Sequence, residues 1–172
     1  MLVFDCETNG LLHDLSEIHC IAIFDSQKEE TFVFNNQGSD CYPITEGLHW
    51  LSNADLIVGH NILGFDIPAF RKTYSWFNTN ADIIDTLVLS RLYHPNMMEI
   101  DKRRNIPRMP LQLYGRHSLE SYGYRLGEYK GEFGKTTDWK EWSQEMQDYC
   151  VQDVHVTTKL CEHFRPYLNG SR

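Results

Sequence analysis

Short apolar runs dominate the first part of the chain and predict strands. Residues 2–7 (LVFDCE), 19–25 (HCIAIFD) and 31–35 (TFVFN) each have the length and the apolar content of a strand. The polar segment DSQKEE between the second and the third run has the composition of a turn. We therefore expect three antiparallel strands at the start of the chain.

The middle of the chain alternates apolar runs with segments of helical character. The continuous apolar run at residues 56–58 is short enough for a buried strand, which favours parallel pairing, and residues 82–84 predict one more short strand. The segments around these runs predict helices at residues 45–52, 64–74 and 86–93, and Pro68 is tolerated early in the second helix. Strands that alternate with helices indicate an α/β domain with a mixed central sheet flanked by helices.

The last part of the chain combines a segment without a regular period and a long helix. Residues 95–115 contain three prolines and a basic cluster, and we interpret this segment as a long surface loop. Residues 118–126 predict a short helix. From residue 143 to about residue 164, apolar residues recur at steps of three and four, which predicts the longest helix. Residues 169–172 have the composition of a tail.

The composition is that of one globular domain. The chain has 172 residues, of which 41% are hydrophobic and 23% are charged. No apolar run approaches the roughly 20 residues that span a bilayer, and the first acid comes too early for a signal peptide. The five cysteines form no CxxC pair, which favours reduced thiols over disulfides or a zinc site. We expect a soluble, cytoplasmic protein without a membrane partner.

The net charge of −8 argues against a nucleic-acid partner, because proteins that bind phosphates usually present a basic face. A metal-dependent nuclease is the exception. Its acids bind divalent cations, and the loaded site then attracts phosphate.

Five polar residues are candidates for such a site. Asp5 and Glu7 lie two residues apart on a predicted strand, so both carboxylates point to one face, where a cation would relieve their repulsion. Tyr149 and Asp153 lie four residues apart on the long helix and therefore share one face. Asp66 falls near a helix start. Taken alone, the DxE pair is more often an exposed acid pair that ends a strand, and the YxxxD pair a buried tyrosine with a solvated aspartate. An acid at a helix start is standard compensation of the helix dipole.

The order and context of these residues carry a family resemblance. The segments FDCETNG (residues 4–10), HNILGFDIPAF (60–70) and YCVQDV (149–154) resemble the three exonuclease motifs of the DEDDy nucleases. The chain looks like the 3′-5′ proofreading exonuclease domain of family A DNA polymerases, and most like the replicative polymerases of podovirus-type phages. The resemblance implies a ribonuclease H-like fold, an exonuclease domain over residues 1–168, a tail at 169–172 and no polymerase domain.

The resemblance also implies a two-metal mechanism. Asp5 is the expected bridging ligand, Glu7 and Asp153 complete the site of the metal that activates water, and Asp66 serves the second metal. Tyr149 orients the attacking water. A ligand set of oxygens alone suits Mg²⁺, with Mn²⁺ as a substitute, better than zinc. His60 and His155 are interpreted as structural residues, with a supporting contact to a metal ligand as the alternative for His60.

A single-stranded DNA 3′ end is the expected partner. By resemblance, the candidate residues for binding it are Thr8, Leu11, Leu12, Asn61, Phe65 and, more weakly, Leu119. Stacking and wedging by such side chains would hold a frayed end without reading its sequence. Packing in the core is an equally common role for each of the apolar ones.

The implied function is the hydrolysis of single-stranded or frayed DNA 3′ ends to nucleoside 5′-monophosphates, as proofreading in phage DNA replication in the host bacterial cytoplasm. Two alternatives stay open. An RNA 3′-5′ exonuclease of the ribonuclease D type uses the same five residues, and a non-catalytic module could serve as a polymerase scaffold, although the intact acids speak against it. The chain is either an excised domain or a separate subunit that works with a polymerase subunit.

Overall fold

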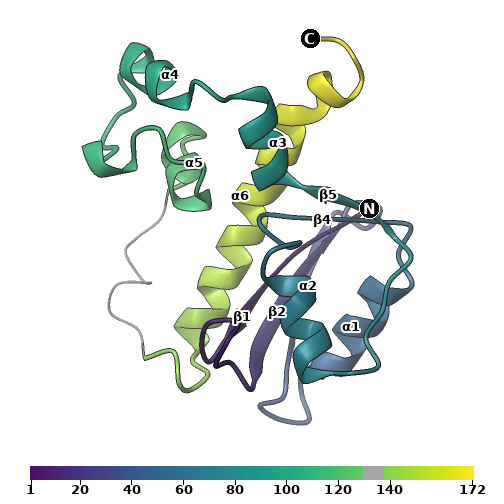
Figure 1. The fold of residues 1–172 in the computed structure, drawn as a ribbon. Coiled ribbons are helices and arrows are strands. Elements are labelled where there is room, and N and C mark those ends of the chain that lie inside the picture. The colour runs from purple at the N-terminus through teal and green to yellow at the C-terminus, as the bar shows by residue number, and fades with distance from the viewer. Residues whose placement is uncertain (130–137) are drawn as a thin grey trace.

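A computed structural model describes residues 1–129 and 138–172, and a five-stranded mixed sheet forms its centre (Figure 1). The strand order is β3-β2-β1-β4-β5, with antiparallel pairing of β1 with β2 and of β2 with β3, and parallel pairing of β1 with β4 and of β4 with β5. The strands are β1 (Leu2–Thr8), β2 (Ile18–Asp25), β3 (Glu30–Asn35), β4 (Leu56–Gly59) and β5 (Asp82–Asp85). The predicted antiparallel start and the change to parallel pairing are both confirmed.

Helices cover both faces of the sheet. Helix α6 packs on one face against β1 and β2, and the other face is covered by α1 and α2 (Figure 1). The helices are α1 (Ile44–Ser52), α2 (Asp66–Thr73), α3 (Thr86–Tyr93), α4 (Met97–Arg104), α5 (Leu119–Arg125) and α6 (Gln144–Leu168). Among the described residues, no helix has both the length and the apolar character needed to cross a membrane.

The pleat of β1 divides its side chains between two cores. Phe4 packs with residues of α1 and α2, whereas Val3 packs with Cys150 and Val154 of α6. Successive side chains of a strand point to opposite faces, so Asp5 and Glu7 share the face of Val3. The two acids of β1 are therefore directed toward α6.

The segment of residues 95–115 is not the predicted surface loop. It contains α4 and a 3₁₀ turn (Leu111–Leu113), and Asp101 of α4 is completely buried. Asp101 accepts hydrogen bonds from Arg125 Nε and Nη2, both at 2.8 Å, and from the backbone N–H of Gly115 at 2.8 Å. Burial alone would raise the pKa of the Asp101 carboxyl, but these donors hold it below its usual value.

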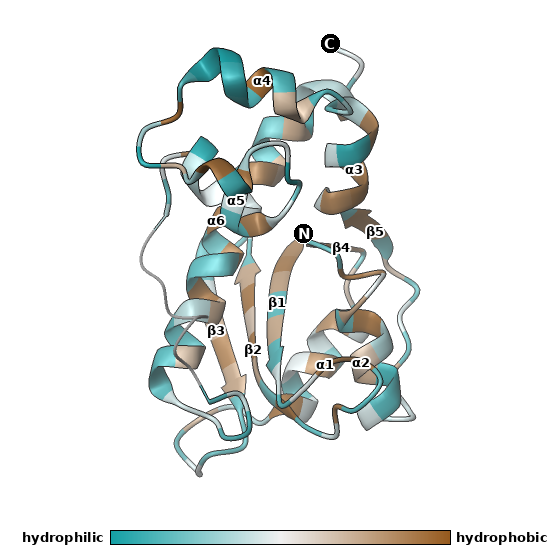
Figure 2. Ribbon diagram, turned by 60° about the vertical axis from the view of Figure 1, so that its left-hand side comes forward, coloured by the Kyte–Doolittle hydropathy of each residue, from teal (hydrophilic) through white to brown (hydrophobic). Residues whose placement is uncertain are grey.

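The sequence did not predict helix α4, because only Met97 and Asp101 of this helix are buried and the contact of Asp101 is ionic. Its residues are mostly hydrophilic (Figure 2), and its one buried acid meets an arginine 24 residues further along the chain. Local periodicity does not record a pairing of this kind. Helix α6 also continues past the predicted end near residue 164, to Leu168, and contains Pro166 near its C-terminal end.

Candidate active site

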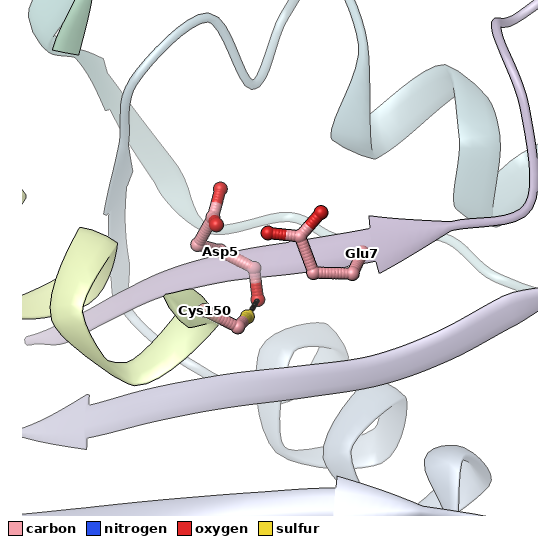
Figure 3. Close-up of side chains that lie close together, drawn as sticks. All are labelled: Asp5, Glu7 and Cys150. Carbon is pink, nitrogen blue, oxygen red and sulfur yellow. Dashed lines mark hydrogen bonds between the residues drawn. The ribbon is translucent and has the colours of Figure 1, made fainter. Parts of the chain in front are cut away.

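The centre of the candidate site is the middle of β1. Figure 3 shows the carboxylates of Asp5 and Glu7 side by side above the strand, with Cys150 of α6 beneath it. One ligand atom of each of the three residues lies within 4.8 Å of the other two. The thiol of Cys150 donates to the carbonyl oxygen of Asp5 at 3.4 Å and belongs to the buried core. Of these three residues, the two acids thus provide the ligand atoms available to a metal ion.

Asp66 enters the site from the other flank, as the first residue of α2. Its side chain is 4% exposed, and its Oδ1 accepts the backbone N–H of Cys6 at 3.2 Å. This hydrogen bond attaches the N-terminus of α2 to the strand that carries Asp5. Burial raises the pKa of the Asp66 carboxyl to about 7, although the hydrogen bonds from Cys6 act in the opposite direction.

The loop before α2 is held by Asp85, a residue to which the sequence analysis gave no role. Its carboxylate accepts the N–H groups of Asn61 at 2.8 Å, Leu63 at 3.0 Å and Leu87 at 3.0 Å. Asn61 has a left-handed backbone with φ of 61°, which bends the loop toward the sheet. An aspartate just before the helical residue Thr86 is the typical signal of an N-cap, and that signal was available in the sequence.

Helix α6 brings Tyr149 and Asp153 to the same place. Cys150 and Val154 of α6 are buried against the sheet, so residues 149 and 153, one position before each, lie along the edge of this contact. Burial, and then the charges of Asp66 and Glu120, raise the pKa of Asp153 to about 7. Burial and the carboxylates of Asp153, Glu7 and Asp5 raise the pKa of the Tyr149 phenol. The structure thus brings the five predicted residues into one electrostatic group.

The acids of this group repel one another when no cation is bound. Burial, followed by the charges of neighbouring carboxylates, raises the pKa of both Asp5 and Glu7 well above the usual range. A set of carboxylate oxygens under mutual repulsion fits a hard divalent cation such as Mg²⁺ or Mn²⁺. The residues present therefore fit the metal ions that the sequence predicts.

Two clefts flank the acids. A cleft of about 570 Å³ is lined by Asp5 and Asp153, by Asn61 and Leu119, and by two arginines and two histidines, Arg91, Arg116, His60 and His117. A second cleft, of about 300 Å³, is lined by Glu7 and by Thr8, Leu11, Phe65 and Trp139. Positive and negative side chains thus share the larger cleft, while the smaller one is mostly apolar.

The predicted substrate residues divide between these clefts, with one exception. Asn61 and Leu119 line the larger cleft, and Thr8, Leu11 and Phe65 line the smaller one. Leu12 instead packs against the apolar core, so the structure separates it from the others. Arg91, Arg116 and Trp139 were not predicted. An isolated arginine or tryptophan gives no local signal that distinguishes a cleft from an ordinary surface.

The two histidines considered in the sequence have structural partners. His60 Nδ1 lies 2.8 Å from Thr86 Oγ1, and burial lowers the pKa of His60 to about 4, so its ring is neutral. His155 Nε2 lies 3.0 Å from the carboxylate of Glu128, which also pairs with Lys159.

The raised carboxyl pKa values predict that pH and metal act together on stability. Asp66 and Asp153 have an ordinary pKa of 3.8 and a folded-state pKa of about 7. The folded protein therefore binds more protons than the unfolded chain between about pH 4 and 7, and stability falls as pH rises through that window. We expect the melting temperature in EDTA to fall from pH 5 to pH 8, and saturating Mg²⁺ to restore it, because the ions bind the deprotonated carboxylates.

The difference in melting temperature between EDTA and Mg²⁺ at each pH reports the contribution of the carboxylates. Buried His60, with a pKa lowered from 6.5 to about 4, changes stability in the opposite direction but equally in both buffers. At pH 8 the free energy of unfolding in Mg²⁺ should exceed that in EDTA by on the order of a few kcal/mol. Asp66→Asn should reduce this difference. A difference that does not depend on pH would contradict the assignment.

Comparison with known proteins agrees with the fold. The family model of the RNase H superfamily matches residues 2–165. Over 94% of its length, the chain is 34% identical to the DNA-directed DNA polymerases of Escherichia phage T7 and Enterobacteria phage T3, and it spans 26% of the length of each. The solved structure of Brucella melitensis NrnC superposes with a TM-score of 0.64 at 17% identity, over 98% of this chain and 74% of that one. The predicted resemblance to phage polymerases is confirmed, and the chain belongs to the RNase H superfamily, with the expected ribonuclease H-like α/β fold.

Proposed function

We propose that this chain is a metal-dependent 3′-5′ exonuclease that hydrolyses single-stranded or frayed DNA 3′ ends to nucleoside 5′-monophosphates, as a proofreading activity in phage DNA replication. The observation that carries the proposal is the convergence of four carboxylates and one phenol, from β1, α2 and α6, beside a cleft with a basic wall. The similarity to two phage DNA polymerases favours DNA as the substrate.

The acids would hold two divalent cations, with Asp5 between them, Glu7 and Asp153 on one side and Asp66 on the other. When bound, such a pair neutralises the phosphate and assists both the attacking and the leaving oxygen. The raised pKa of Tyr149 keeps its phenol protonated at neutral pH, so the hydroxyl orients the attacking water by a hydrogen bond and does not remove its proton.

The two clefts provide places for the 3′ end. Arg91 and Arg116 lie on the same cleft as Asp5 and carry the charge that a backbone phosphate requires. Leu11 is 65% exposed at the smaller cleft, beside Phe65, where an unpaired base could stack or be wedged. We assign residues 1–168 to the exonuclease domain and residues 169–172 to its tail. A polymerase subunit and the host cytoplasm are the proposed partner and location.

Labelled oligonucleotides test the proposal directly. Single-stranded DNA and RNA of one sequence, labelled at either end, are incubated with Mg²⁺, with Mn²⁺ and with EDTA. We expect a descending ladder from 5′-labelled DNA, immediate release of mononucleotide from 3′-labelled DNA, and no reaction in EDTA. Preferential trimming of RNA would favour a ribonuclease D-type enzyme. The absence of metal-dependent release from both substrates would favour a non-catalytic scaffold.

A further inference from the structure

A second polar cavity lies at the helical end of the molecule, away from the carboxylates. Helices α3, α4 and α5 gather around the C-terminal part of α6 (Figure 1), and among them is a cavity of about 280 Å³. His163, which lines it, follows Asp153 by ten residues on α6, or roughly 15 Å along the helix at about 1.5 Å per residue. None of the five predicted active-site residues lines this cavity.

The charged side chains that line the cavity are arginines, and two histidines accompany them. Its lining includes His94, Arg104, Arg125 and His163, together with apolar side chains of α4 and α5, but no carboxylate. The nearby Asp101 uses both carboxylate oxygens for Arg125. In a protein with a net charge of −8, a cavity with this lining is a local exception.

Arg125 retains an unused donor. Its side chain is 2% exposed, and Nε and Nη2 donate to Asp101 and to the carbonyl of Arg116. Nη1 is buried and has no hydrogen-bond partner within residues 1–129 and 138–172. A buried guanidinium N–H without an acceptor is costly, and an anion in the cavity would supply one.

The two histidines form a close pair. His94 Nε2 lies 2.8 Å from His163 Nε2, so the N–H of one ring donates a hydrogen bond to the unprotonated nitrogen of the other. Burial, and then charges that include Arg125 for His94 and Arg104 for His163, lower the pKa of both rings. A cation in the cavity would meet the same two arginines, and the cavity lining offers no third metal ligand. An anion would instead be attracted by Arg104 and could accept hydrogen bonds from Arg125 Nη1 and from the neutral rings.

We propose that this cavity binds a phosphate-class oxyanion, either free inorganic phosphate or the terminal phosphate group of a nucleotide or a nucleic-acid strand. Arg104 provides the positive charge at the rim, and Arg125 Nη1 and the outer N–H of the His94–His163 pair donate hydrogen bonds to the oxyanion. The volume of about 280 Å³ suits a phosphate group and is at the lower end of small-molecule sites. The site is separate from the proposed hydrolysis.

Phosphate titration of the metal-free protein tests the site. In EDTA the acids of the active site repel phosphate, and the ¹⁵N resonances of His94 and His163 distinguish binding in the second cavity from binding at Arg91 and Arg116 of the larger cleft. Inorganic phosphate is compared with chloride at equal ionic strength. A nucleoside 5′-monophosphate, and a short oligonucleotide with and without a 5′-phosphate, distinguish a free ion from a phosphate carried by nucleotide or strand.

Adjacent arginines give a matched pair of variants. Arg104 lines the cavity, whereas the exposed Arg103 faces Glu99 at 4.0 Å. We expect saturable phosphate binding, shifts of the His94 and His163 resonances, and a loss of affinity of roughly tenfold or more in Arg104→Gln and His163→Gln. Arg103→Gln should bind like the unsubstituted protein. An absence of saturable binding, or equal affinity in Arg104→Gln and Arg103→Gln, would overturn the proposal.

Discussion

Asp5→Asn is expected to lower the rate of nucleotide release from single-stranded DNA by at least about a thousandfold. Asp5 lies in the middle of β1, within 4.8 Å of Glu7, and shares the cleft with Asp153. It is the only one of the four acids that we assign to both cations. A metal ion provides several kcal/mol of transition-state stabilisation, and about 4 kcal/mol corresponds to three factors of ten. Single-turnover hydrolysis of 5′-labelled DNA in Mg²⁺ measures the effect.

Two further variants make this result interpretable. Asp82→Asn removes an exposed carboxylate at the start of β5, away from the site, and should leave the rate unchanged. Tyr149→Phe keeps every carboxylate. Its rate of nucleotide release should fall roughly ten- to a hundredfold, and its Mg²⁺-dependent gain in melting temperature should be unchanged. Full activity of Asp5→Asn would mean that hydrolysis takes place elsewhere and would refute the assigned site.

Arg125→Met is expected to lower the free energy of unfolding by about 3–5 kcal/mol, because it leaves the buried charge of Asp101 without its partner. The loss should appear as a lower midpoint of urea denaturation. The double variant Asp101→Leu/Arg125→Met removes both charges, and we expect it to recover much of the stability.

Arg103→Met is the control for this second prediction. Arg103 is exposed on α4, near Arg104, and its loss should change stability by less than about 0.5 kcal/mol. If the double variant is as unstable as Arg125→Met, the ion pair of Asp101 with Arg125 does not stabilise the fold by compensating buried charge. The hydrogen bond that the N–H of Gly115 donates to Asp101 would then be the more important contact.

The sequence predicted the elements whose stability comes from apolar periodicity. The three antiparallel strands and the two parallel ones were expected within one or two residues, because each has a continuous or alternating apolar pattern. Helix α4 was missed, since Met97 is its only buried apolar residue and its other buried residue, Asp101, is held by the ion pair with Arg125. Such contacts depend on the folded chain and not on neighbouring residues.

The candidate site was predictable to a similar extent. The pleat places Asp5 and Glu7 together, and the helix places Tyr149 beside Asp153, from spacing alone. That β1, α2 and α6 converge is a property of the topology, for which the family resemblance was needed. The position of Leu12 in the core, and of Arg91, Arg116 and Trp139 on the clefts, follows from three-dimensional packing that no local pattern records.

The repulsion among the four carboxylates has a consequence for natural selection. Replacing any one of them with a neutral residue relieves the repulsion and should stabilise the metal-free fold. Mutations that remove these acids would therefore not be selected against for loss of stability. A lineage that used the domain only as a scaffold would lose them early. In the proposed function, bound cations offset this repulsion, so the fold tolerates the four acids together because they hold metal.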